Sequence, residues 1–122
     1  MPKKFFVILW IGFAFNYLNA QETTYYTHDE ADYFHALELY HNKAYVAAQH
    51  AFKEISSNYD EFSEMRANCD YYVANCAVRL GDQNADELVT DFVDKYPNST
   101  KRNDAFMEVA TYYYNTGKYA HA

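Results

Sequence analysis

Two cysteines carry the most reactive side chains in the sequence, and their spacing limits what they can do. Cys69 and Cys76 are seven residues apart, which places them on one helix face but about 10 Å apart along its axis. A disulfide needs Cα atoms within about 7 Å, so the two cannot bond to each other. The spacing of two to four residues that zinc sites use is also absent. We interpret both as small buried residues in a packing stripe, with an intermolecular disulfide as the alternative.

Histidines and carboxylates could bind a metal or perform acid–base catalysis, but their pattern favours solvated surfaces. His28, Asp32 and His35 recur at helical spacing and could share one face as metal ligands. An acidic stripe is formed by Asp86, Glu87, Asp91 and Asp94. Acid–base catalysis by paired carboxylates needs unequal, shielded environments, so we interpret both groups as solvent-facing. With no phosphate-binding loop and no nucleophile–base pattern visible, we expect no enzymatic activity, no cofactor and no metal.

The segment Asn98-Ser99-Thr100 has the form of a glycosylation acceptor. It directly follows Pro97, which ends a helix-like pattern, and it precedes another such pattern. Serine, threonine and asparagine are also the residues that cap helix N-termini. We therefore predict a turn and a helix cap at this segment.

The composition favours a small helical domain that does not bind nucleic acid. The chain has 122 residues, 3 Gly and 2 Pro, and the scarcity of turn-forming residues favours long helices. Tyrosine is abundant, at 14 residues, and suits thin, half-wet packing layers because it packs like Phe but keeps a polar tip. The net charge of −7 would repel phosphate and anionic membrane surfaces.

The N-terminus has the order of features of a secretory signal peptide. A basic pair, Lys3-Lys4, precedes an apolar run, Phe5–Phe15, and a small residue, Ala20, follows. The run is shorter than the roughly 20 residues of a membrane-spanning helix. We predict that residues 1–20 are cleaved, with 21–27 as a linker, and that the protein is exported without a membrane span; an uncleaved anchor is the alternative.

The sequence repeats itself with a shift of 37 residues. Small or apolar residues mostly fall on small or apolar residues at this shift, and the matches are in phase, so the set is stronger than any one match. The matched positions are Ala48, Ala85 and Ala122; Ala36, Val73 and Ala110; Ala31, Asn68 and Ala105; Leu39, Cys76 and Tyr113; Ile55 and Phe92; and Tyr59 and Tyr96.

Apolar residues within each repeat recur at helical spacing. Gly81 is expected to end one helix as a C-cap, Pro97 to end another, and Gly117 to follow the last. The pattern predicts helices over residues 28–41, 44–59, 61–80 and 84–96, and from the cap at 98–100 through 115. We thus expect helix pairs joined by short turns.

These residues resemble the tetratricopeptide repeat, which places a small residue in its first helix, an aromatic near the turn, Ala and then an aromatic in its second helix, and Pro at its end. The resemblance covers about residues 31–122. The matching residues are Tyr45, Ala48 and Phe52; Ala85, Val89 and Pro97; and Phe106, Val109, Ala110, Tyr113, Gly117, Tyr119 and Ala122. The longer repeat is similar to that of bacterial envelope proteins, including outer-membrane assembly lipoproteins.

The resemblance implies an all-α fold, a right-handed α-solenoid of stacked antiparallel helix pairs. Its units would cover residues 28–60, 61–97 and 98–122, and the third would be incomplete, so we expect a fragment of a longer array. The last full helix would then lack a cover for its apolar face, and that face could self-associate. The residues of this face are Phe106, Val109, Ala110 and Tyr113.

In tetratricopeptide arrays the first helix of each pair lines a concave groove that holds peptides or partner proteins. The 37-residue shift places the corresponding positions at Tyr33, Leu37 and Tyr40; Asp70, Ala74 and Ala77; and Met107, Thr111 and Tyr114. We therefore expect an exported protein-interaction scaffold of the bacterial cell envelope, located in the periplasm or at the outer membrane. The alternatives are a component of outer-membrane protein assembly or envelope division, and the non-catalytic N-terminal part of a larger enzyme.

Overall fold

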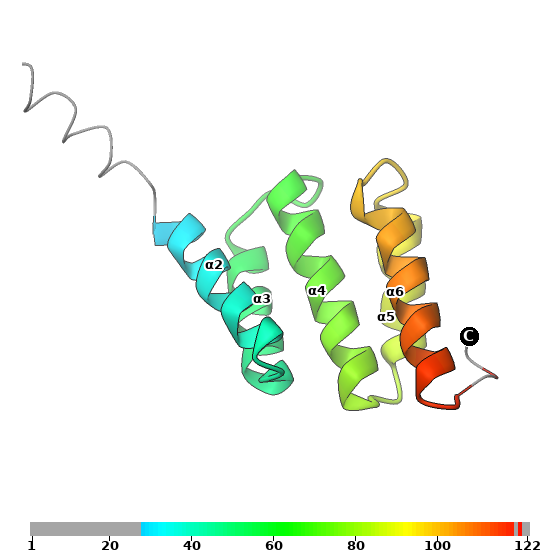
Figure 1. The fold of residues 1–122 in the computed structure, drawn as a ribbon. Helices are drawn as coiled ribbons and strands as arrows, with labels where there is room; N and C mark the ends of the chain where they lie inside the picture. The colour runs from blue at the N-terminus through cyan, green and yellow to red at the C-terminus, as the bar shows by residue number, and fades with distance from the viewer. Residues whose placement is uncertain (1–27, 119, 121–122) are drawn as a thin grey trace, which may run out of the picture. The chain divides into compact units, whose positions relative to one another are not determined.

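The computed structural model describes residues 28–118 and residue 120. The predicted signal peptide and linker, and the last repeat match at Ala122, lie outside these residues. The described residues form helices and no strand, which confirms the all-α prediction (Figure 1). The helices are α2 (His28–His41), α3 (Tyr45–Ser57), α4 (Glu64–Leu80), α5 (Ala85–Lys95) and α6 (Lys101–Asn115).

The N-terminal boundary of α4 differs from the prediction because a serine hydroxyl caps the helix. α4 begins at Glu64, later than expected, because Ser63 Oγ accepts a hydrogen bond from the Arg66 amide at 3.2 Å and so acts as the N-cap. Before α6, Ser99 Oγ accepts from the Lys101 amide at 3.1 Å. The predicted turn at residues 98–100 is thus confirmed. Thr100 occupies the N-cap position of α6 but makes no side-chain cap hydrogen bond, and the hydroxyl that accepts from the first turn belongs to Ser99.

The same left-handed turn follows each of α2, α4 and α6. The residues with positive φ are Lys43, Gly81 and Gly117, at 62°, 71° and 76°. In each turn a backbone amide reaches back five residues to a carbonyl near the helix end, the closure of a Schellman motif. These bonds run from Ala44 to Leu39, Asp82 to Ala77 and Lys118 to Tyr113, with N···O distances of 2.9, 3.0 and 2.8 Å.

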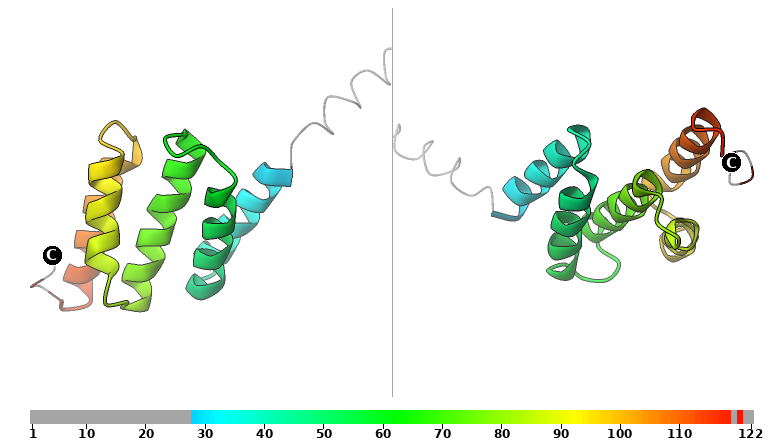
Figure 2. Two further views of the ribbon diagram at one scale, coloured as in Figure 1. Left: turned by 180° about the vertical axis from the view of Figure 1, so that it is seen from behind. Right: turned by 90° about the horizontal axis from the view of Figure 1, so that it is seen from below.

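Successive helices form the pairs α2–α3 and α4–α5, and α6 begins a third. In Figure 1, α2 lies in front of α3, α6 lies in front of α5, and α4 stands between α3 and α5. The view from behind in Figure 2 brings α3 and α5 to the front. The packing described below concerns the described residues from Asp32 onward.

One face of α4 packs against α2 and α3, and together they form a first hydrophobic core cluster. Phe52 of α3 is fully buried there and stacks on the ring of Tyr72, with 4.8 Å between ring centroids. Gln49 Nε2 also donates to the Val73 carbonyl at 3.2 Å. The buried members of the cluster are Ala36 from α2; Ala48, Phe52 and Ile55 from α3; and Cys69, Val73 and Cys76 from α4. α3 is therefore held between α2 and α4.

The opposite face of α4 packs against α5 and α6. A second cluster contains Ala74, Ala77, Val78, Ala85, Val89, Val109 and Tyr113. A third contains Ala67, Tyr71, Phe92, Val93, Tyr96 and Ala105. Phe52, Ile55 and Phe92 fill the space between helices, since each lies in a cluster with residues of a following helix.

Positions 37 residues apart share their degree of burial in the two second helices. Ala48 and Ala85 are both buried, as are Phe52 and Val89. Ile55 and Phe92 are buried in the same way. The sequence repeat is thus also a repeat of packing environments.

The expected uncovered face of α6 is only partly uncovered. Val109 and Tyr113 are buried against α4 and α5, whereas Phe106 is 51% exposed and Ala110 is half-buried. The prediction is wrong for Val109 and Tyr113 because α6 turns these residues toward α4. The face that remains open carries Phe106 and Met107.

Both cysteines are free and buried, as predicted for packing residues. Burial raises the pKa of the Cys69 thiol to about 12 and that of the Cys76 thiol to about 12. A thiol is nucleophilic only when ionised, so neither side chain is prepared for covalent chemistry.

Exchanging the residues at the left-handed turns should change stability in opposite directions. Lys43→Gly is expected to stabilise the fold by about 0.5–1 kcal/mol, because glycine adopts positive φ without steric cost. Gly81→Ala should destabilise it by about 1 kcal/mol for the same reason; an added Cβ would meet no atom closer than Lys118 Nζ at 3.9 Å. Urea unfolding followed by circular dichroism measures both, and two changes of the same sign would contradict the assignment.

Candidate protein-binding surface

The predicted groove residues of α6 lie on an exposed surface. Met107 is 68% exposed and Tyr114 is 66% exposed. Thr111 is exposed between them. Large apolar side chains left in water are a common feature of surfaces that bind other proteins.

The predicted groove residues of α2 form a half-buried aromatic layer. The ring of Tyr40 lies 5.1 Å from that of Tyr72, and the ring of Tyr33 lies 5.8 Å from that of Phe52, both edge to face. Leu37 packs beside them. These side chains support the core and also present a partial surface.

The predicted groove residues of α4 are mostly unavailable to a ligand. Ala74 is 4% exposed and Ala77 is fully buried, so placing them in an open groove is wrong. Their side chains lie in the second core cluster, which α5 and α6 cover. Alanine has a small side chain, so neighbouring helices can pack close to α4 at these positions and bury them.

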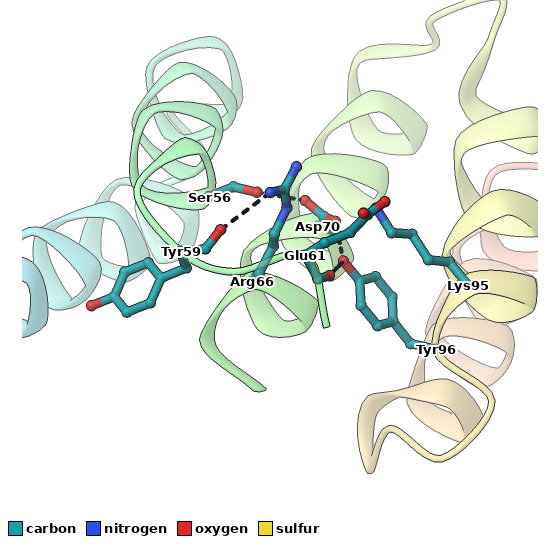
Figure 3. Close-up of polar contacts among 7 residues, drawn as sticks. All are labelled: Ser56, Tyr59, Glu61, Arg66, Asp70, Lys95 and Tyr96. Carbon is teal, nitrogen blue, oxygen red and sulfur yellow. Dashed lines mark hydrogen bonds and ion pairs between the residues drawn. The ribbon is translucent and has the colours of Figure 1, made fainter. Parts of the chain in front are cut away.

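Asp70, the third predicted groove residue of α4, is occupied by contacts within the chain. One carboxylate oxygen accepts from the Ser56 hydroxyl at 2.8 Å, and the other accepts from the Tyr96 hydroxyl at 2.7 Å (Figure 3). Hydrogen bonds to a charged acceptor are stronger than neutral ones. Asp70 therefore ties α3 and the end of α5 to α4.

The loop between α3 and α4 is held by the same group of contacts. The hydroxyl oxygen of Tyr96 also lies 3.0 Å from the carbonyl oxygen of Glu61 (Figure 3). The Nζ atom of Lys95 lies 3.3 Å from the Glu61 carboxylate and forms an ion pair with it. Arg66 Nη1 donates to the Tyr59 carbonyl at 3.1 Å. The role of these residues is to fix the connection between the helix pairs.

An open cavity of about 350 Å³ lies between α4 and α6. Two of the predicted groove residues, Met107 and Thr111, line it. The complete lining consists of Arg79, Met107, Glu108, Thr111, Tyr112 and Asn115. It combines apolar surface with hydroxyl, amide and charged groups, the mixture that orients a bound peptide.

Glu108 is held in place from the α4 side of this cavity. Its Oε2 atom accepts a hydrogen bond from the Tyr71 hydroxyl at 2.6 Å and another from Asn75 Nδ2 at 2.9 Å. Tyr71 and Asn75 are both buried. Burial raises the pKa of Tyr71 strongly, and the hydrogen bond to Glu108 adds to the rise.

Arg79 is held by an aromatic ring. Its guanidinium carbon lies 4.7 Å from the centroid of Tyr112, a cation–π contact. Burial raises the pKa of Tyr40 to about 12, while the charge of Arg79 lowers it and that of Glu108 raises it. The two charges therefore act on the same tyrosine, at the surface between α2, α4 and α6.

Among the described side chains, the candidate metal ligands do not assemble into a site. Within residues 28–118, no group of three or more His, Cys, Asp or Glu side chains is placed to hold a metal ion. His35 lies 3.9 Å from Glu38, and the side chain of His28 is outside the described part. The acidic stripe of α5 is exposed, as predicted, although Asp86 also accepts from the Tyr113 hydroxyl at 2.7 Å.

Arg79 and Glu108 were not found from the sequence. Glu108 corresponds to Tyr71 and Phe34 under the 37-residue shift, so the repeat gives no sign that a charge is needed there. Arg79 stands in the last turn of its helix, where a basic residue is already favoured by the helix dipole. Only the packing of α6 on α4 brings the two residues to one cavity.

In the described part of the chain, no helix has the length and apolar character needed to cross a membrane. No family model, curated protein or solved structure matches the chain.

Removing the Tyr96 hydroxyl should weaken the attachment of α5 to α4. We expect Tyr96→Phe to lower the free energy of unfolding by about 2 kcal/mol, since a hydrogen bond to a carboxylate is lost. Tyr33→Phe is the matched control, because the Tyr33 hydroxyl makes no hydrogen bond among the described residues. Equal unfolding free energies for the two variants would contradict the role given to Tyr96.

The buried phenols should make the fold sensitive to high pH. Burial raises the pKa of Tyr113 to about 12, with its hydrogen bond to Asp86 adding to the rise, whereas an unfolded tyrosine ionises near pH 10. Because the unfolded state loses its proton first, stability is complete below about pH 10 and falls toward pH 12. Urea unfolding across this range should show the loss, with a smaller loss for Tyr113→Phe. A stability that is independent of pH there would contradict the assignment.

Proposed function

We propose that the protein is an exported tetratricopeptide-type repeat protein that holds peptide or protein segments on the surface built by α2, α4 and α6. Its helix pairs would stack as an α-solenoid, and it would act as an interaction scaffold in the bacterial cell envelope. This surface is the one that the first helices of the pairs share.

The observation that carries the proposal is the repeated packing. Residues 37 positions apart occupy equivalent buried places in α3 and α5, and the same left-handed turn closes α2, α4 and α6. Repeated helical hairpins produce extended surfaces on which other chains bind. The abundance of tyrosine on this side supports binding, since tyrosine provides contact area at low entropic cost.

The cavity between α4 and α6 is the place on this surface best suited to a peptide. Met107 provides apolar contact, while Thr111 and Asn115 can exchange hydrogen bonds with a peptide backbone. The charges of Arg79 and Glu108 lie in the same lining. An extended segment could therefore be bound through its backbone and oriented by its side chains.

Site-specific crosslinking tests whether this surface contacts other proteins. A photoreactive residue in place of Thr111 should form adducts with partner proteins in cells that produce the protein. Thr90, exposed on α5, is the matched control position and should form few. Adducts at Thr90 but not at Thr111 would place the binding surface elsewhere and contradict the proposal.

Export is tested by the N-terminus of the mature protein. If residues 1–20 are a cleaved signal peptide, mass spectrometry of the protein recovered from the cell envelope should find Gln21 first. Recovery of chains that begin at Met1 would contradict cleavage.

A further inference from the structure

Arg79 is a partly buried cation that forms no ion pair with a carboxylate of the described residues, although the protein is acidic. The chain carries 17 Asp and Glu residues against 10 Lys and Arg residues, yet no ion pair joins Arg79 to a carboxylate within the described residues. Its Nε atom is buried and has no hydrogen-bond partner there. The Nε atoms of Arg66 and Arg102 are buried without a hydrogen-bond partner in the same way. Arg79 differs from both because it also lines the cavity between α4 and α6, where a ligand can reach its charge.

Glu108, a candidate partner for Arg79, is held by other groups. Glu108 lines the same cavity, but its Oε2 atom accepts hydrogen bonds from Tyr71 and Asn75 of α4. Arg79 in turn is fixed against the ring of Tyr112. The two opposite charges therefore share a cavity without neutralising each other.

We propose that Arg79 receives an acidic side chain of the bound segment, an internal Asp or Glu of an extended peptide. A carboxylate in the cavity would meet the guanidinium of Arg79, with the Thr111 hydroxyl and the Asn115 amide as further donors. Met107 would contact an apolar residue next to the acidic one. Glu108, which lines the same cavity, would disfavour a second acidic residue beside the first.

This inference rests on the proposed function and specifies its ligand. The ligand class is a peptide with one acidic residue flanked by apolar residues. The basis of the choice is the difference between the two charged groups of the lining. Glu108 keeps its negative charge but already accepts two hydrogen bonds from α4, whereas Arg79, the only basic residue of the lining, has no ion-pair partner among the described residues.

Two short peptides test the inference on the whole protein. The probes are N-acetyl-Leu-Asp-Leu-amide and N-acetyl-Leu-Asn-Leu-amide, which differ only in the charge of the central residue. Titration is followed by the backbone amide signals of Thr111 and Asn115 in ¹⁵N–¹H spectra. We expect the Asp peptide to bind about fivefold more tightly, the effect of one partly exposed ion pair, and the difference to shrink at high salt.

The variants separate the role of Arg79 from general electrostatic attraction. Arg79→Gln should abolish the preference for the Asp peptide. Arg102→Gln is the matched control and should keep it, because Arg102 also lies over an aromatic ring, 6.0 Å from the centroid of Phe106, but is outside the cavity lining. Melting temperatures of both variants establish that they are folded.

Each other outcome overturns the inference. Equal binding of the two peptides would show a site that is indifferent to charge, and would leave the proposed peptide-binding function intact. If the Arg79→Gln variant still preferred the Asp peptide, that preference would have to come from another cation. Absence of shifts at Thr111 and Asn115 with either peptide would remove the site, whereas the proposed function would still be decided by the crosslinking at Thr111.

Discussion

The structure depends on the burial of α4 on two opposite faces. One face closes the core around α3, and the other packs on α5 and α6. A helix covered in this way cannot carry large apolar residues all around if its neighbours are to approach closely. α4 meets this constraint mostly with small residues: Ala67, Cys69, Val73, Ala74, Cys76, Ala77 and Val78. Its larger buried members, Tyr71 and Asn75, both donate hydrogen bonds to Glu108 of α6.

Hydrogen bonds between tyrosine hydroxyls and carboxylates add polar links to the apolar packing of small residues between the helices. Tyr71 donates to Glu108, Tyr96 to Asp70, and Tyr113 to Asp86, all within 2.7 Å. Two of these bonds connect two helices, and the third connects α4 with Tyr96, directly after α5, which gives these tyrosines a structural purpose beyond packing. The bond to Glu108 also extends to the surface, because it fixes one charged wall of the cavity between α4 and α6.

The sequence was sufficient for the helices and turns but not for the surface. Helical spacing, the turn at Gly81 and the 37-residue shift correctly predicted local structure and the burial of Phe52 and Phe92, because these depend on residue type and short-range pattern. The shift could not predict that Ala74 is covered, since coverage depends on how closely α6 approaches α4. For the same reason Asp70 looked like a ligand contact although its carboxylate is committed to Ser56 and Tyr96.

Native-state hydrogen exchange tests most directly whether α4 is the helix on which the others depend. If it is, the amides of residues 69–78 should exchange only through global unfolding, more slowly than those of α2 and α6, whose outer faces are open to water. The free energy of exchange for these amides should equal the free energy of unfolding measured with urea. Exchange in α4 as fast as in α6, or through local openings of lower free energy, would contradict the account.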